Sequence, residues 1–489
     1  MPRPLVLIHG YSAEGIDFRP LKDALAAKRI DPETINICNY ISLNNEVTIK
    51  DIAEGLERAF RVHPVLCDDH QDFDAIVHST GMLVLRSWLT NNGTPLDQNR
   101  RLARLKHLVG LAPATWGSPQ AHKGRTWLGA LVKGNKHVGP DFLNAGDQVL
   151  DGLELASKFL WDLAHRDLLG PRPYYDKGPE TPYVTVFIGN QPYEGLASVA
   201  NDPGTDGTVR WAGCGLNTRK ITIDLTRAPV GTDGQAVARA TISSWADNRL
   251  DIPLIPVDGR NHGSLISEPE DGMVQLVADF LKVGEDGGET HEAWLARANE
   301  YGNRGRGPML INPGAGAAGV SAEFKKFFGH LIGHSGDAVM EGWQQFVVHA
   351  RDERGDGIQD YMIEVLTRGE DGQWIPFTDM YTDVHAYGAD ASYRCFHVRL
   401  PQGLAAGTVP LKARIHASTG TPIVAYQGYS AEAKDVTQSS EAVELDITNL
   451  GDGQGSLFFP FTTTLIEIVL NREPLPFDKE SELLKFMSV

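Results

Sequence analysis

The sequence has 489 residues, with 63 acidic and 45 basic side chains and a formal net charge of −18. A surface of this charge repels phosphate backbones, so we do not expect nucleic acid as a partner. The composition, with 42% hydrophobic and 22% charged residues, is typical of a soluble globular protein, and the length predicts two domains.

The four cysteines, Cys38, Cys67, Cys214 and Cys395, are widely scattered and form no Cys-x-x-Cys pair. We therefore expect free thiols and assign no metal ligand. No apolar run approaches the roughly 18 residues of a membrane span. The first apolar run, at residues 5–8, begins too early for a signal peptide, which predicts a cytoplasmic protein, or a secreted one if a leader has been removed.

Residues 1–283 alternate between strand-like and helix-like segments. Residues 49–60 and 273–281 repeat apolar side chains at the spacing of an amphipathic helix. Strands that are apolar throughout are buried on both faces, so the pattern predicts an α/β domain with a mostly parallel sheet covered by helices. The apolar runs of strand length occur at 5–8, 35–40, 73–77, 105–111, 182–188 and 252–257.

A long excursion, residues 117–176, separates two of these predicted strands. A crossover normally takes one helix, so a segment of this length with apolar residues on several faces is unusual. We predict that it forms a helical cap. Its candidate contacts for an apolar substrate are Trp127, Leu128, Leu131 and Phe159.

The pattern changes after residue 283. Residues 284–308 contain the segments GEDGGET and NRGRGP, whose glycines and charges predict a linker. Within residues 309–489, the segments 394–400, 411–417 and 443–447 alternate apolar and polar side chains. Short strands with Asp-Gly turns and no helices between them predict an antiparallel β-sandwich.

The strongest chemical signal is the serine at position 79. The strand-like run 73–77 leads directly into His78-Ser79-Thr80-Gly81 and then into an apolar helix. A serine on such a tight turn presents its hydroxyl near a helix N-terminus, where developing negative charge is favoured. A serine that only caps an ordinary helix would show the same local pattern.

This segment resembles the nucleophile elbow, G-x-S-x-G, of the α/β hydrolases, and particularly of bacterial lipases. It departs at one position, because Val77 stands where the motif has glycine. A β-branched residue crowds that turn, so the resemblance requires a small neighbour or a shifted backbone.

Further segments resemble the same families over about residues 4–283. The run His9-Gly10-Tyr11-Ser12 resembles their oxyanion loop, which implies that the amides of Tyr11 and Thr80 bind the oxyanion. Gly117-Ser118-Pro119 resembles a turn that follows the strand after the elbow in many lipases.

The resemblance also implies a carboxylate and a histidine in the chain order Ser, Asp or Glu, His. Asp206 in PGTDGTV resembles the Asp-Gly-x-Val segment that carries the acid in several lipase families, and Asp202 is the alternative. His262 in GRNHGSL follows the last predicted strand, where this fold carries its catalytic histidine.

These residues imply a serine hydrolase that cleaves carboxylic esters through an acyl-enzyme, as a lipase or carboxylesterase on apolar acyl esters. No cofactor is expected, because the glycine-rich segment 314–319 matches a dinucleotide fingerprint without the βαβ unit that such a site needs. The expected partners are a small-molecule or lipid ester and, transiently, a lipid surface. The alternatives are an acyltransferase or peptidase on the same fold, or an inactive hydrolase-like scaffold whose sandwich binds lipid, polymer or protein surfaces.

Overall fold

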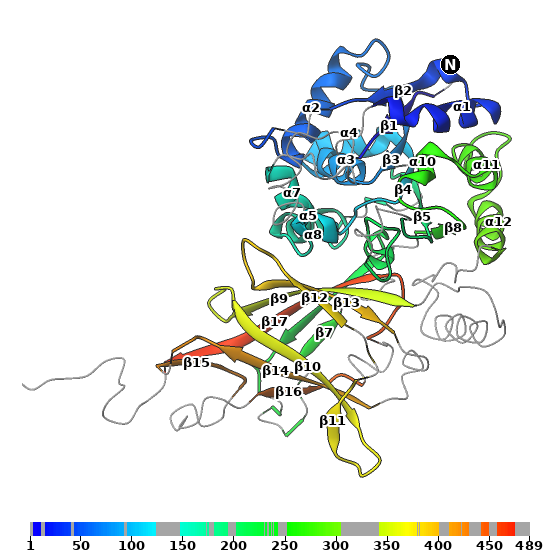
Figure 1. Cartoon of the computed structure of the whole chain (residues 1–489). Coiled ribbons are helices and arrows are strands. Elements are labelled where there is room, and N and C mark those ends of the chain that lie inside the picture. Colours follow the sequence, from blue (N-terminus) through cyan, green and yellow to red (C-terminus); the bar gives the residue numbers. More distant parts are fainter. Residues whose placement is uncertain are drawn as a thin grey trace, which may run out of the picture.

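The computed structural model shows two domains, each built of layers of secondary structure (Figure 1). The first is built around a parallel sheet, and the second is a β-sandwich. The structure describes residues 3–10, 15–40, 44–91, 95–123, 147–172, 174–175, 180–193, 202–228, 230–231, 234–235, 237, 239–242, 252–304, 342–378, 380, 382–400, 410–421, 423–429, 442–448 and 457–474.

The sheet of the first domain is parallel at every pairing that the structure describes. Its strand order is β2-β1-β3-β4-β5-β8, so the order reverses beside β1 and the carboxyl ends of β1 and β3 lie next to each other. Ligands of open α/β sheets bind at such a reversal. The strands match the apolar runs of the sequence: β1 (Leu5–Ile8), β2 (Ile35–Cys38), β3 (Phe73–His78), β4 (Leu105–Leu111), β5 (Tyr183–Gly189) and β8 (Leu254–Val257).

Helices cover both faces of this sheet, as the fully apolar strands require. On one side lie α1 (Arg19–Ala27), α11 (Asp271–Phe280) and α12 (His291–Arg304); on the other lie α2 (Ile49–Val62), α3 (Gly81–Thr90) and α8 (Lys158–Asp167) (Figure 1). Shorter connections contain α4 (Pro95–Arg104), α5 (Pro119–Lys123), α7 (Asp147–Leu153) and α10 (Ser264–Ser267). None of the helices in the described ranges is long and apolar enough to cross a membrane.

The second domain is a β-sandwich, as the alternating segments predict. One sheet is antiparallel, in the order β11-β10-β14-β16; the other has the order β12-β13-β9-β17-β6-β7, with β15 on β17. The second sheet is mixed rather than antiparallel, because β17 runs parallel to β9 and to β6. The bounds are β9 (Trp343–Asp352), β10 (Asp360–Arg368), β11 (Trp374–Pro376), β12 (Thr382–Ala386), β13 (Tyr393–Arg399), β14 (Leu411–Ser418), β15 (Val424–Gln427), β16 (Val443–Asp446) and β17 (Thr463–Pro474).

Two strands cross the boundary expected at residue 283. β6 (Thr218–Asp224) and β7 (Ala240–Ile242) come between β5 and β8 in the chain, but they pair within the sandwich. The expected division at 283 therefore does not separate the two domains. β6 alternates buried and half-buried residues from Arg219 onward, which suits a sandwich face rather than a sheet buried on both sides.

The prediction of a linker at residues 284–308 is wrong for residues 291–304. Residues 291–304 form α12, which packs on α11. Trp294 and Ala298, one helical turn apart, are fully buried, and the Trp294 indole N–H donates to the Leu276 carbonyl at 2.9 Å. Burial of this face holds the segment as a helix despite its polar composition.

The predicted cap, residues 117–176, is described only in part. α8 packs on α3, where Asp167 and Arg86 form a fully buried ion pair, and its Trp161 contacts His349 and Tyr393 of the sandwich. This helix is therefore a packed element between the domains rather than a cover over the site. The four cysteines are free, as expected.

Candidate active site

Ser79 occupies a strained turn between β3 and α3. Its φ is +53°, in the left-handed region that residues other than glycine rarely adopt. The turn depends on Gly81, because a Cβ there would lie 2.4 Å from the Ile8 carbonyl oxygen of β1. Opposite Val77 on β4 is Gly110, so the small neighbour that the departure from the motif requires is present.

The loop after β1 runs against the serine. A Cβ on Gly10 would lie 2.7 Å from the Ser79 Cβ and 3.3 Å from its Oγ, so only glycine fits there. His9 stacks on Tyr40, whose hydroxyl donates to the His9 carbonyl at 3.0 Å. Thr80 is buried directly before α3, while Tyr11 lies outside the described residues, so their assignment to an oxyanion hole stays a prediction.

Asp206 and His262 meet through their side chains. The His262 Nδ1–H donates to the Asp206 Oδ2 at 3.0 Å, and both side chains are buried. The other carboxylate oxygen accepts the amides of Thr208 at 3.0 Å and Val209 at 2.9 Å, which fixes the carboxylate. Asp202, the alternative acid, instead offers its backbone carbonyl to the Thr205 hydroxyl at 2.7 Å.

Ser79 and His262 line one pocket, with a volume of ≈ 440 Å³. This size lies within the range of small-molecule sites. Thr80 and Gly10 lie in the same wall as the serine. Apolar side chains form much of the remainder: Ala114, Ala121, Leu150, Leu153 and Ile266.

Of the four expected substrate contacts, the structure describes Phe159. Trp127, Leu128 and Leu131 lie outside the described residues. Phe159 is half-buried and packs on the core of the first domain, and it is not among the residues that line the pocket. Leu150 and Leu153, which line the pocket, were not among the expected contacts, although their i, i+3 spacing on α7 was a signal for one shared face.

Comparisons with known proteins bear on the fold. No protein-family model matches the chain, and no curated protein matches its sequence. Phospholipase PlaB from Legionella pneumophila is similar in structure over 99% of this chain and 98% of its own, at a TM-score of 0.67 and 20% identity. Its complex with thio-NAD gives the same coverage and TM-score at 19% identity.

The lipase BlEst2 of Bacillus licheniformis in its mature form covers 44% of this chain and 79% of its own, at 13% identity and a TM-score of 0.32. That likeness is too low to add to the argument. The long similarity and the parallel sheet with its serine turn agree on the architecture. The first domain has the α/β-hydrolase fold.

The hydrolase domain holds its histidine loop through a residue that the sequence analysis did not assign. The His78 Nε2–H donates to the backbone carbonyl of His262 at 3.0 Å, and the two rings lie 4.7 Å apart. Burial, together with the nearby His262, lowers the pKa of His78 to about 3, so this imidazole is neutral. His78 thereby joins the end of β3 to the loop that carries His262, and its place directly before Ser79 was the available signal.

The sandwich supports the loop of the hydrolase domain that carries Asp206. Gly204 has a φ of +71°, and a Cβ there would lie 2.6 Å from the Trp343 ring of β9. The buried Arg210 donates to the Cys395 Sγ of β13 at 3.2 Å. The Thr463 hydroxyl of β17 donates to the Ala212 carbonyl at 3.0 Å. Three sandwich strands thus hold the segment on both sides of the carboxylate.

Proposed function

We propose that this protein is a serine ester hydrolase that works through an acyl-enzyme, with Ser79 as nucleophile, His262 as base and Asp206 as orienting acid. One observation carries the proposal: the buried Asp206–His262 hydrogen bond at the pocket that Ser79 lines. The left-handed backbone of Ser79 supports it, since such strain in a non-glycine residue clusters at functional sites.

In the proposed mechanism, the His262 Nε2 accepts the hydroxyl proton of Ser79 as the Oγ attacks the ester carbonyl. Asp206 holds the Nδ1–H and stabilises the imidazolium that forms. The imidazolium then protonates the leaving alcohol, and a water activated by the same histidine releases the acid. In this proposal the amides of Thr80 and Tyr11 stabilise the oxyanion.

Apolar acyl esters are the proposed substrate class. The wall that contains Leu150, Leu153 and Ile266 suits an acyl chain, because burying each methylene contributes about 0.8 kcal/mol. The similar structure is named a phospholipase, so phospholipids are proposed as the first natural class of ester to test.

The test is covalent labelling of the protein with a fluorophosphonate, followed by peptide mapping. We expect one label on Ser79, no label on Ser79→Ala, and unchanged labelling of Ser418→Ala, which alters an exposed serine of the sandwich. An unlabelled wild type with no hydrolysis of p-nitrophenyl esters would instead identify an inactive scaffold.

A series of p-nitrophenyl esters and phosphatidylcholine then defines the substrate. A rate that rises with acyl length supports the apolar wall as the acyl site. A rate that falls steadily beyond acetate would contradict this assignment while leaving the ester hydrolase intact.

A further inference from the structure

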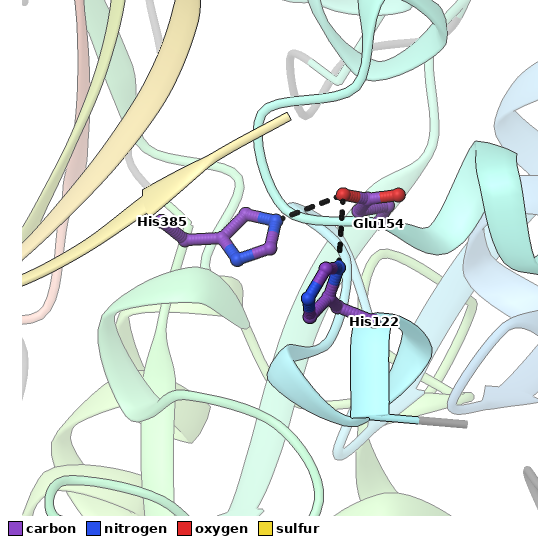
Figure 2. A group of neighbouring side chains, drawn as sticks. All are labelled: His122, Glu154 and His385. Atoms are coloured by element: carbon purple, nitrogen blue, oxygen red, sulfur yellow. Dashed lines mark hydrogen bonds and ion pairs between the residues drawn. The ribbon is translucent and has the colours of Figure 1, made fainter. Parts of the chain in front are cut away.

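Two histidines and a glutamate converge where the sandwich meets the hydrolase domain (Figure 2). His122 lies in α5, Glu154 directly follows α7, and His385 lies in β12. Their ligand-type atoms lie within 4.8 Å of one another. The His385 Nε2 is 3.0 Å, and the His122 Nδ1 is 3.5 Å, from the same Glu154 Oε1. Both imidazoles point toward the carboxylate from different elements.

We propose that His122, Glu154 and His385 bind a Zn²⁺ that joins the two domains, with water as the fourth ligand. Imidazole nitrogens with a carboxylate oxygen suit zinc, whereas calcium and magnesium take oxygen ligands. Zinc bonds of about 2.0–2.2 Å in a tetrahedron place neighbouring ligand atoms roughly 3.3–3.6 Å apart. The distances from Glu154 Oε1 to His122 and His385, 3.5 and 3.0 Å, lie in or close to this range.

The surroundings of Glu154 suit a ligating carboxylate. Its side chain is 1% exposed, and the Gly388 N–H donates to the Oε1 at 2.8 Å. Hydrogen bonds of this kind orient the ligands of metal sites, and a cation compensates the cost of burying the negative charge. The His122 side chain is 44% exposed, which leaves a side of the cluster open to solvent for the ion and the water ligand.

The ion would join the wall of the catalytic pocket to the sandwich. Ser118 and Glu154 form a β-bridge, and the Ser118 amide donates to the Leu153 carbonyl at 2.9 Å. Ser118, Leu153 and Ala121, the residue before His122, all line the pocket. A hydrogen bond from the Tyr387 hydroxyl to Asp151 at 2.9 Å crosses the same contact. This site does not depend on the proposed ester hydrolysis.

The test measures zinc binding by the full-length protein. The protein is stripped with a chelator and titrated with ZnCl₂ against a chromophoric competitor, and bound metal is counted by mass spectrometry after gel filtration. We expect one Zn²⁺ per chain and a melting temperature that rises by several degrees with zinc. Cobalt in place of zinc should give the intense visible absorption of a tetrahedral site.

The decisive variants are His122→Ala, whose exposed side chain makes misfolding improbable, and His385→Ala. Each should weaken zinc binding at least tenfold and abolish the thermal shift. His416→Ala, a half-buried histidine of β14 outside the cluster, is the matched control and should bind like the wild type. Zinc binding below one equivalent in the wild type, or equal binding by all variants, would overturn the site and leave a hydrogen-bonded contact between the domains.

Discussion

Asp206 and His262 are joined twice: the imidazole donates to the carboxylate at 3.0 Å, and the His262 backbone N–H donates to the Asp206 carbonyl at 3.0 Å. These two bonds hold together two loops that are 56 positions apart in the sequence. The backbone bond does not involve the Asp206 side chain, so the orienting role of the carboxylate can be tested separately from the structure of the loop.

Asp206→Asn should lower kcat for ester hydrolysis by roughly 10³–10⁴-fold with little change in the melting temperature. The amide removes the charge that stabilises the imidazolium and favours the wrong tautomer of His262. Steady-state kinetics with a p-nitrophenyl ester measures this effect. Asp202→Asn is the matched control and should retain most activity; the reverse result would transfer the role of the acid to Asp202.

Asp167→Asn should destabilise the protein by about 3–5 kcal/mol, because it leaves Arg86 as a buried charge without its counter-ion. The two side chains are fully buried, and Asp167 also accepts the Tyr175 hydroxyl at 2.7 Å. Chemical denaturation measures the change. The double variant Arg86→Met with Asp167→Leu should recover much of the loss, and a double variant no more stable than Asp167→Asn would contradict this explanation.

Stability should fall as the pH decreases from about 6.5 to 4, in part because of His349. Burial lowers the pKa of His349 to about 4 and outweighs the nearby Glu467, which raises it. Over this interval the folded imidazole stays neutral while the unfolded one binds a proton, so the contribution is complete above pH 6.5 and is lost on acidification. One such group adds at most about 1.4 kcal/mol per pH unit.

The corresponding variant is His349→Phe, which keeps a ring against Tyr393, stacked at 4.0 Å in the wild type. Between about pH 4 and 6.5, the free energy of unfolding of this variant should depend less steeply on pH than that of the wild type. Between about pH 7.5 and 8.5, the two slopes should be equal. Equal slopes in the acidic interval would show that His349 is not responsible.

A chain truncated after Arg304 should not yield a soluble hydrolase domain. Truncation removes β17, which pairs with β6. It also removes Trp343, whose ring lies against Gly204 beside Asp206. An unpaired edge of this kind is prone to aggregation. Expression with gel filtration and circular dichroism tests this expectation; a monomeric, active fragment would show that the sandwich is dispensable.

The sequence alone determined the sheet of the hydrolase domain and the candidate residues of the site. Strands buried on both faces are continuous apolar runs, so their positions are readable without tertiary contacts. Ser79, Asp206 and His262 stand in short glycine-containing segments, and the structure joins the last two directly. The departure at Val77 also implied a small neighbour or a shifted backbone, and Gly110 lies opposite it on β4.

Only the tertiary structure decided which distant segments are partners. An alternating pattern shows which face of a strand is buried but not which strand pairs with it, and Thr218 of β6 meets Thr463 of β17 across 245 positions. The same holds for His122, Glu154 and His385, which carry no shared motif and meet because α5, the end of α7 and β12 pack together. Side chains that converge from separate elements owe their proximity to the packing of the whole chain.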